Sequence, residues 1–249
     1  MGLSTDKILN GAASLATTMV GQTTKSSPIQ HLDIGSGHGE LIEILRTKSD
    51  LISFACDYTE KLMKLDAINV DVVDLNVENL PYKASSFELV TCTEVLEHLE
   101  HYRETIREVH RVLKDDGVFI LTTPNILNLK SRVRFLIFGF YNLFGPLHFK
   151  ESELHSAGGH INPISLYYTI HSLVDAGFKD FEITIDKRQT TSWFWLIPLF
   201  APIKLFSYIT RRREKARYGT IDEHNEKYVL LMNSLDILLG RTLIVGCRK

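Results

Sequence analysis

The residues with the clearest chemical potential lie in the stretch HLDIGSGHGE, residues 31–40. Three glycines recur there at every second position: Gly35, Gly37 and Gly39. Glycine lets a backbone turn tightly and approach a ligand closely. A dinucleotide-binding turn would read GxGxxG, with a pyrophosphate at the helix N-terminus, but Glu40 replaces its third glycine. Asp33 adds a carboxylate, which suits a cationic ligand group better than a pyrophosphate. A glycine-rich turn alone can be only a tight connection between a strand and a helix, so the residues around it must show whether it binds a ligand.

Two further acids stand where the next two strands are expected to end. Asp57 follows Asp33 by 24 residues, and Asp74 is followed by Leu75. A carboxylate at the first place can accept hydrogen bonds from two ribose hydroxyls, although a lone strand-end aspartate is more often simply solvated. Asp74 could accept a hydrogen bond from an adenine amino group while Leu75 covers the ring. Because ligands bind at the carboxyl ends of parallel strands, this ordered set predicts a nucleoside cofactor.

Glu94, Glu97 and His98 form an ExxEH motif. On a helix, positions i, i+3 and i+4 share one face, and two carboxylates with an imidazole can bind a divalent cation. The plainer interpretation is a set of loop or helix residues at the pocket rim. His98 is also a candidate general base, because the pKa of histidine is about 6.5.

His160 is the second candidate base. It lies in AGGHINP, residues 157–163. Paired glycines indicate a mobile lid over an acceptor site; alternatively, His160 simply precedes a helix cap at Asn162. Both interpretations stay open at this point.

Strand and helix patterns alternate along the first half of the chain. Strands are predicted at 29–34, 51–56, 69–73, 87–91 and 118–122, and later at 181–186 and 242–247. Helices are predicted at 40–46, from about 60, and at 101–113 and 163–176. This order indicates an α/β fold with a mostly parallel, Rossmann-like sheet covered by helices on both faces.

The composition is that of an ordinary globular protein. The 249 residues carry a formal net charge of -2, with 44% hydrophobic and 23% charged residues. These values exclude a disordered chain, a collagen and a multi-span membrane protein, and they argue against a nucleic-acid-binding protein. The three cysteines are widely spaced and the N-terminus is a poor signal peptide, so we expect a reducing, cytoplasmic location. One domain over 1–249 is expected, with a cofactor-binding core at 29–125.

Two apolar segments, 133–149 and 193–208, contain half of the 24 aromatic residues and have lysines or arginines beside them. A spanning helix needs about 20 mostly apolar residues. Glycines and prolines interrupt both segments, including Pro198 and Pro202, so we expect no membrane span. Aromatic and basic residues together suit an interfacial segment on an anionic bilayer. The alternative is a helical cap buried on the sheet, with arginines extending from its edge.

The ordered motifs resemble class I S-adenosylmethionine-dependent methyltransferases over about 29–125. The resemblance is carried by LDIGSGHG, ACD at 55–57, VDL at 73–75, LPYKASSFELVTCTEVLEHL at 80–99 and REVHRVLKDDGVFILTTPN at 107–125. It implies a seven-stranded sheet whose last strand is antiparallel. It also implies that Asp33 and the loop of Gly35, Ser36, Gly37 and Gly39 hold the methionine moiety. Asp57 would hold the ribose, Tyr58, Asp74 and Leu75 would surround the adenine, and Thr93 would line the site.

The activity implied is methyl transfer from S-adenosylmethionine. EVLEH resembles the quinone-biosynthesis O-methyltransferases, where a cation is implicated. The segment after TPN, followed by GHINP, resembles methyltransferases of polysaccharide and glycolipid loci. We therefore predict O-methylation of a lipid-linked or membrane-associated acceptor by a cytoplasmic protein at the inner membrane face, with substrate-cap or membrane-contact insertions at about 128–162 and 190–217. The alternatives are an NAD(P)-dependent oxidoreductase and an inactive, methyltransferase-like membrane adaptor.

Overall fold

A seven-stranded sheet forms the centre of the computed structural model, which describes residues 5–23, 27–147 and 159–249. The strand order is β3-β2-β1-β4-β5-β7-β6, and β7 runs antiparallel to β5 and β6. The strands are β1 (Ile29–Ile34), β2 (Leu51–Asp57), β3 (Val70–Val72), β4 (Phe87–Thr93), β5 (Leu113–Pro124), β6 (Lys179–Ile185) and β7 (Thr242–Arg248). The predicted mostly parallel sheet with an antiparallel last strand is confirmed.

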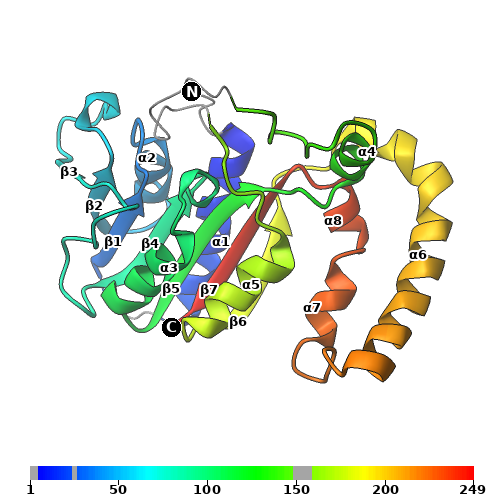
Figure 1. Cartoon of the computed structure of the whole chain (residues 1–249). Coiled ribbons are helices and arrows are strands. Elements are labelled where there is room, and N and C mark those ends of the chain that lie inside the picture. The colour runs from blue at the N-terminus through cyan, green and yellow to red at the C-terminus, as the bar shows by residue number, and fades with distance from the viewer. Residues whose placement is uncertain (1–4, 24–26, 148–158) are drawn as a thin grey trace.

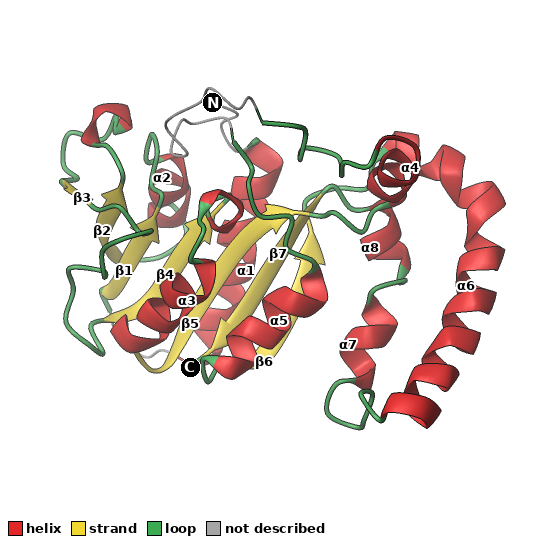
Figure 2. Ribbon diagram, viewed as in Figure 1, coloured by secondary structure: helices red, strands yellow, loops and turns green. Residues whose placement is uncertain are grey.

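Helices cover both faces of this sheet (Figure 2). On one face lie α1 (Asp6–Thr23) and α2 (Glu40–Arg46), and on the other lie α3 (Tyr102–Val112) and α5 (Leu166–Asp175). The central strands are therefore buried on both sides: Val118, Phe119, Ile120 and Leu121 of β5 are all 0% exposed. A strand buried on both sides needs a continuous run of apolar residues, which explains why β1, β4 and β5 could be predicted from the sequence.

Two helix predictions need correction, and one helix was missed. The helix expected from about 60 is a single 3₁₀ turn, Glu60–Leu62, because the backbone turns to extended geometry at Met63. The helix expected at 163–176 begins at Leu166, with Ser165 as the cap residue. Asn162 does not cap it, since its side-chain amide donates to the carbonyl of Leu99. The helix α1 was not predicted at all.

Four helices form a separate group beside the β6 edge (Figure 1). They are α4 (Leu129–Phe138), α6 (Thr190–Tyr218), α7 (Glu226–Leu231) and α8 (Leu235–Leu239). α4 starts at Asn128, whose side chain accepts a hydrogen bond from the backbone N–H of Ser131, and ends at Gly139 with φ 76°. The predicted glycine break in the first apolar segment is thus confirmed, whereas residues 148–149 of that segment lie outside the described residues.

The predicted break in the second apolar segment is wrong, because α6 continues for 29 residues through Pro198 and Pro202. Each proline removes one helix hydrogen bond and usually kinks the helix, and Figure 1 shows α6 bending near its start above α4. Among the described residues, α6 is the one helix long and apolar enough to cross a membrane by length and composition. Its most apolar 18-residue window has a mean hydropathy of 1.3 and is 0% buried.

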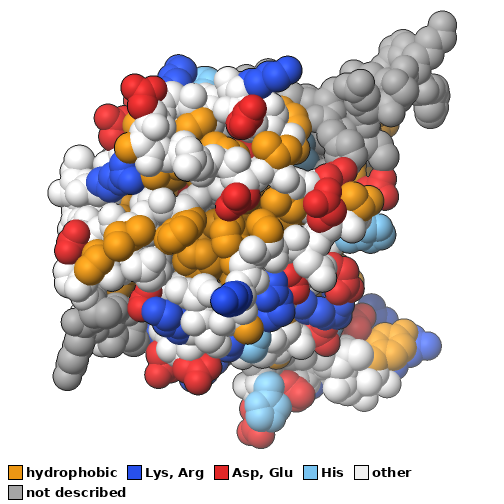
Figure 3. Space-filling view, turned by 90° about the vertical axis from the view of Figure 1, so that its left-hand side faces the viewer, with side chains coloured by type: hydrophobic (Ala, Val, Ile, Leu, Met, Phe, Trp, Pro, Cys, Tyr) orange, Lys and Arg blue, Asp and Glu red, His pale blue; other side chains and the backbone are white. Residues whose placement is uncertain are grey.

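The opposite edge of the sheet, at β2 and β3, carries a second exposed apolar band (Figure 3). Its large side chains include Ile52, Phe54 and Val72, which are 45%, 39% and 56% exposed. This band is uncovered because only the short 3₁₀ turn connects β2 to β3. Charged side chains of both signs surround it.

Candidate functional site

A cavity of about 330 Å³ opens at the carboxyl ends of β1, β2 and β4. Its volume is in the range of small-molecule and cofactor sites. Most predicted site residues line it: Gly35, Ser36, Gly37, Asp57, Tyr58, Asp74, Leu75, Thr93, His98 and His160. The parallel sheet therefore brings the glycine loop, the two later acids and His98 to one place, and His160 joins them from the segment before α5.

The glycine loop after β1 is held in left-handed backbone geometry. φ is +69° at Gly35 and +50° at Gly37, a region that side chains with a Cβ rarely adopt. A Cβ on Gly35 would lie 2.2 Å from Cγ2 of Val95, whereas a Cβ on Gly37 would meet nothing within 4 Å. Gly35 is therefore required by packing, and Gly37 presents bare backbone to the cavity.

We expect this difference to separate stability from ligand binding. Gly35→Ala adds left-handed strain and a clash, which together should lower the free energy of unfolding by about 2–5 kcal/mol. Gly37→Ala adds only the strain, about 1–2 kcal/mol, but fills the ligand side of the loop. Urea unfolding measures the first effect, and calorimetry with S-adenosylhomocysteine measures the second. Equal stability losses in the two variants would contradict this assignment.

Asp57 is the acid most clearly aimed at the cavity. It is 8% exposed, and its Oδ2 accepts a hydrogen bond of 2.9 Å from the backbone N–H of Gly37. Its Oδ1 is buried without a hydrogen bond of ordinary geometry, as is the Oγ of Ser36. Burial raises the pKa of Asp57, although backbone N–H groups oppose that shift. Buried polar atoms normally form hydrogen bonds, so a ligand hydroxyl at this point would provide the missing partner for Oδ1 of Asp57 and for Oγ of Ser36.

Asp33 and Gly39 lie behind the loop and do not line the cavity. Asp33 is 1% exposed and accepts a hydrogen bond of 2.6 Å from Oγ1 of Thr91. Burial raises the pKa of Asp33 to about 7 despite that bond. A Cβ on Gly39 would approach Met63 and Leu65 to 2.8 Å. The structure thus gives both residues a supporting position, and a direct contact of Asp33 with a ligand stays a prediction.

The other predicted cofactor residues lie around the rim. Tyr58 is 46% exposed, and Asp74 accepts a hydrogen bond of 3.0 Å from the backbone N–H of Asn76. Leu75 lies beside Asp74, and Thr93 ends β4 at 8% exposure. This arrangement offers a flat, partly apolar wall next to the acid at the end of β2.

Comparison with known proteins bears directly on this site. A family model described as a methyltransferase domain matches residues 32–121. The chain is 31% identical over 137 residues to the uncharacterized methyltransferase YcgJ of Bacillus subtilis, covering 49% of this chain and 51% of that protein. It is 32% identical over 105 residues to the ubiquinone biosynthesis O-methyltransferase of Haemophilus ducreyi, covering 38% of this chain and 44% of that protein.

The sheet order agrees with these matches. A solved structure of a SAM-dependent methyltransferase from Archaeoglobus fulgidus shares the fold with a TM-score of 0.55 at 17% identity, over 97% of this chain and 96% of that chain. The matched domain and the antiparallel β7 between β5 and β6 together decide the family. Residues 32–121 belong to the methyltransferase domain family, and the sheet has the class I S-adenosylmethionine-dependent methyltransferase fold. It spans about half the length of the curated relatives that it matches.

The cavity residues of this domain fit S-adenosylmethionine, the methyl donor of the class I family. Oδ1 of Asp57 lacks a hydrogen bond of ordinary geometry and suits a ribose hydroxyl, and the bare backbone at Gly37 leaves room for an extended chain beside it. Asp74 and Leu75 stand where the resemblance expects the adenine. The individual roles of these residues stay predictions. The domain match and the sheet order favour this assignment over the NAD(P)-dependent oxidoreductase.

The two histidines meet at the far side of the same cavity. Their ring centroids are 4.7 Å apart at 76°. The segment of His160 is tied down by backbone hydrogen bonds from Ile161 and Asn162 to the carbonyl of Glu97, of 2.9 Å and 3.0 Å. Nδ1 of His98 lies 2.9 Å from the carbonyl of Gly159. Only a protonated Nδ1 can donate to a carbonyl, so Nε2 of His98 is left with its lone pair.

Both histidines are neutral at pH 7 in this setting. Burial lowers the pKa of His98, and burial with the neighbouring His98 lowers the pKa of His160 to about 4. A neutral imidazole with a fixed tautomer can accept a proton from a hydroxyl group. The proposed lid involves Gly158, which lies outside the described residues, and the helix-cap explanation fails because that helix begins after Ser165.

The expected helical ExxEH face does not exist. Glu94 has φ +55°, and only Leu96–His98 form a 3₁₀ turn. The carboxylate of Glu94 instead accepts a hydrogen bond of 3.2 Å from Oγ1 of Thr122. Glu97, His98 and His160 are the three that come together, with one ligand atom each lying within 4.8 Å of the others.

Sequence reasoning missed two contributions to the cavity, whereas Leu143 lies in the cap insertion expected at about 128–162. Ile8 and Leu9 come from α1, Thr5 directly precedes that helix, and Arg241 precedes β7. The buried positions of α1 recur with a helical period, so this helix could have been predicted from the sequence. Arg241 had no local signal, because the β6–β7 pairing brings it to the site from the end of the chain.

Proposed function

We propose that this methyltransferase methylates a hydroxyl group of a lipid-linked acceptor, such as a glycolipid, a polysaccharide precursor or a quinone. The observation that carries the proposal is the apolar wall of the cavity on its histidine side. Leu143 lines the cavity and is itself 43% exposed, and the ring of Phe144 lies 5.2 Å from that of His160. Exposed apolar side chains of α4 continue this wall outward from Phe135 to Phe138. An amphiphilic acceptor fits such an entrance.

The choice of oxygen as the acceptor atom rests on the neutral His98. A hydroxyl must lose its proton as it is methylated, and Nε2 of His98 can accept one. The relative from Haemophilus ducreyi is named as an O-methyltransferase, which supports the same choice. The inactive-adaptor alternative is less favoured because Asp57, Ser36 and both histidines surround one cavity.

In this mechanism the chain mainly binds and orients. S-adenosylmethionine supplies a methyl group already activated on a sulfonium. Asp57 and the glycine loop fix the nucleoside end, and His98 faces the acceptor side. Holding two reactants in line is worth roughly 7–11 kcal/mol of the barrier. The general base contributes about 10²–10⁴-fold more.

A divalent cation is a second candidate occupant of the histidine side. Glu97 is 0% exposed, and neither carboxylate oxygen has a hydrogen bond of ordinary geometry. Nδ1 of His160 is also buried without a hydrogen bond of ordinary geometry, although the backbone of Leu143 lies close to this ring. A buried carboxylate is costly unless it is protonated or paired, and two neutral imidazoles beside it complete a set that suits a transition metal. We propose that this trio can hold such an ion, in which case the ion would activate the hydroxyl instead of His98.

The test is titration with Co²⁺, followed by its absorption spectrum and by calorimetry. One ion should bind to the wild-type chain, and His160→Ala should weaken binding by about 10-fold or more. His171→Ala is the matched control, since His171 is exposed on α5. No binding, or the same affinity in the His160 and His171 variants, would exclude the metal.

The acceptor is tested by incubating the protein with methyl-labelled S-adenosylmethionine and a cell lipid extract. We expect the label in an organic-soluble product that carries a new methyl ether. Asp57→Ala serves as the control without cofactor binding. Label found only in the aqueous fraction would overturn the lipid-linked acceptor, and a methylamine product would overturn the choice of oxygen. Cofactor binding without any labelled product would favour the adaptor. The expected cytoplasmic location is part of this proposal.

A further inference from the structure

The side of α6 that faces away from the body is apolar and has no described partner. We name four of its side chains the outer stripe: Phe194, Ile197, Leu205 and Ile209, which are 71%, 86%, 57% and 40% exposed. Their positions follow the helical repeat, so they lie along one side. A surface helix of a soluble domain turns its apolar side to the core. In α6 an apolar side is turned to the surroundings.

The other side of α6 is fastened to the neighbouring helices through Asn233, at the turn between α7 and α8. Nζ of Lys204 donates to the backbone carbonyl of Asn233 at 2.9 Å, and the side-chain amide of Asn233 donates to Oγ of Ser207 at 2.9 Å. Arg132 of α4 donates to Oδ1 of the same Asn233 at 2.7 Å. These bonds fix which side of α6 is turned outward.

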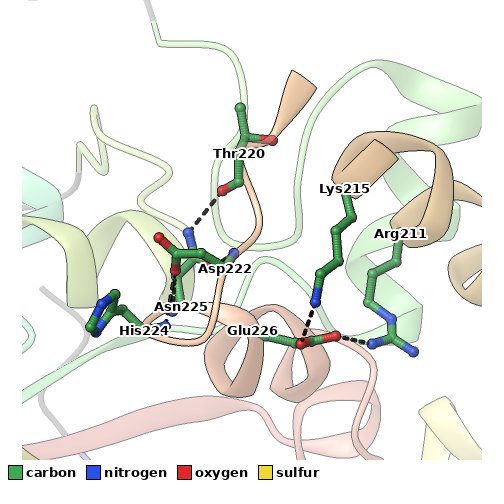
Figure 4. A network of polar contacts seen from close by, with 7 residues as sticks. All are labelled: Arg211, Lys215, Thr220, Asp222, His224, Asn225 and Glu226. Atoms are coloured by element: carbon green, nitrogen blue, oxygen red, sulfur yellow. Dashed lines mark hydrogen bonds and ion pairs between the residues drawn. The ribbon is translucent and has the colours of Figure 1, made fainter. Parts of the chain in front are cut away.

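The C-terminal end of α6 is basic and equally fixed. Figure 4 shows Arg211 and Lys215 both reaching Glu226 of α7, the Lys215 pair at 3.1 Å. In the turn between the helices, Oδ1 of Asp222 accepts the backbone N–H of His224 at 2.9 Å. Arg212, Arg213 and Arg217 form no ion pair with a described residue. The segment 190–213 contains no acidic residue.

The end of α4 extends the same apolar surface. Leu136 and Ile137 are 84% and 75% exposed, and α4 packs against α6. Exposed apolar side chains therefore occur on both of these packed helices: α4 lies just before Leu143 of the cavity wall, and α6 ends at the arginines. Soluble monomers rarely expose large contiguous apolar patches.

We propose that this α4–α6 surface docks on an anionic phospholipid bilayer, with α6 lying parallel to the membrane. The stripe from Phe194 to Ile209 is about 22 Å long at 1.5 Å per residue, which is shorter than the roughly 30 Å of a hydrocarbon core. The bonds to Asn233 also keep one side of the helix against the body. Aromatic and aliphatic side chains enter the interface while Arg212, Arg213 and Arg217 reach the headgroups.

The charges at the α4–α6 surface favour an anionic bilayer as its partner over a second copy of the chain. A bilayer with anionic lipids complements a surface that has no acidic residue over 190–213 and three arginines without an ion pair to a described residue at its end, where Glu214 is the one acid of 211–217. The other exposed apolar band, at β2 and β3, is surrounded by both signs of charge (Figure 3) and lacks such a bias. Docking extends the proposed function by bringing the cavity to a lipid-linked acceptor. It is measured without methyl transfer, so the two can fail separately.

The experiment is flotation of the full chain with vesicles of phosphatidylcholine, with and without phosphatidylglycerol. The wild type should float with the anionic vesicles and far less with neutral ones. Ile197→Glu should weaken the partition by about 10-fold or more. Arg212→Glu with Arg213→Glu should weaken it by at least about 10-fold, and added salt should mimic this loss. Ile52→Glu, in the β2–β3 band, is the matched control and should float like the wild type.

Binding of S-adenosylhomocysteine by each variant reports an intact fold. Four results would overturn the proposal: no flotation of the wild type, equal flotation with neutral vesicles, an unchanged Ile197→Glu, or an equal loss in Ile52→Glu. Light scattering without lipid measures the oligomeric state and so tests whether a second copy of the chain covers this surface. A wild-type dimer that Ile197→Glu converts to a monomer, with no flotation, would assign the surface to a second copy of the chain.

Discussion

Asp57→Ala should abolish tight binding of S-adenosylhomocysteine while leaving the fold intact. Oδ1 of Asp57 is buried without a hydrogen bond of ordinary geometry, and Oδ2 accepts a hydrogen bond from the backbone N–H of Gly37. Two hydroxyl donors to a carboxylate contribute about 1.5–3 kcal/mol each, and a tenfold change in affinity corresponds to about 1.4 kcal/mol. Calorimetry should therefore record a loss of about 10²–10⁴-fold. The melting temperature should change far less than the affinity, because the alanine removes only contacts with the backbone N–H groups of Gly37, Tyr58 and Thr59 beside the cavity.

Two further variants sharpen this result. Asp57→Asn keeps one oxygen acceptor but no charge, so its affinity should fall between those of wild type and alanine. Asp71→Ala changes an acid on β3 whose hydrogen-bond partner is the hydroxyl of Tyr82, and it should bind normally. Unchanged affinity in Asp57→Ala would remove Asp57 from the cofactor site.

The raised pKa of Asp57 adds a pH dependence with a definite sign. Burial raises the pKa above the ordinary value of 3.8, so the carboxylate takes up a proton at a less acidic pH than usual. A ribose hydroxyl prefers the ionised form as its acceptor. Affinity for S-adenosylhomocysteine should therefore be full at neutral pH and decline as the pH falls through the raised pKa. The decline should be absent in Asp57→Asn.

The cofactor half of the protein was predictable because its signals are local. β1 and α2 were predicted with the bounds that the structure has, since a buried strand, a glycine turn and an amphipathic helix follow each other directly. Asp57 and Asp74 could be placed near the glycine loop because parallel strands end at one edge of the sheet. The antiparallel β7 came from the family resemblance alone, since its residues pair with partners far along the chain.

The acceptor half was less predictable because distant contacts decide it. Pro198 and Pro202 argue locally against a helix, yet bonds from Lys204 and Ser207 to Asn233 support α6 through tertiary contacts. The ExxEH motif was assigned a helical face because spacing cannot reveal the positive φ of Glu94. His160 joined His98 through backbone hydrogen bonds to the carbonyl of Glu97, which leave no trace in the sequence pattern.

His98→Gln should lower kcat by about 10²–10⁴-fold without changing the affinity for S-adenosylhomocysteine. The glutamine amide can still donate to the carbonyl of Gly159, which accepts from Nδ1 of His98 in the wild type, so the segment of His160 should stay in place. What is lost is the lone pair on Nε2, and a general base contributes a factor of that size. Single-turnover rates on the labelled lipid acceptor, with calorimetry alongside, measure the two quantities.

His160→Gln distinguishes the two roles proposed for His98 and His160, which are general-base catalysis by His98 and metal binding by both histidines. As a neighbour of a general base, His160 would mainly shape the acceptor side, and the loss of rate should be about tenfold or less, with no effect of chelators on the wild type. If His160 is a metal ligand with Glu97 and His98, His160→Gln should lower kcat as much as His98→Gln does. Chelation should then abolish the wild-type rate. A rate within about threefold of wild type in His98→Gln would eliminate both roles, because each of them requires Nε2 of His98 to meet the acceptor hydroxyl or its ion.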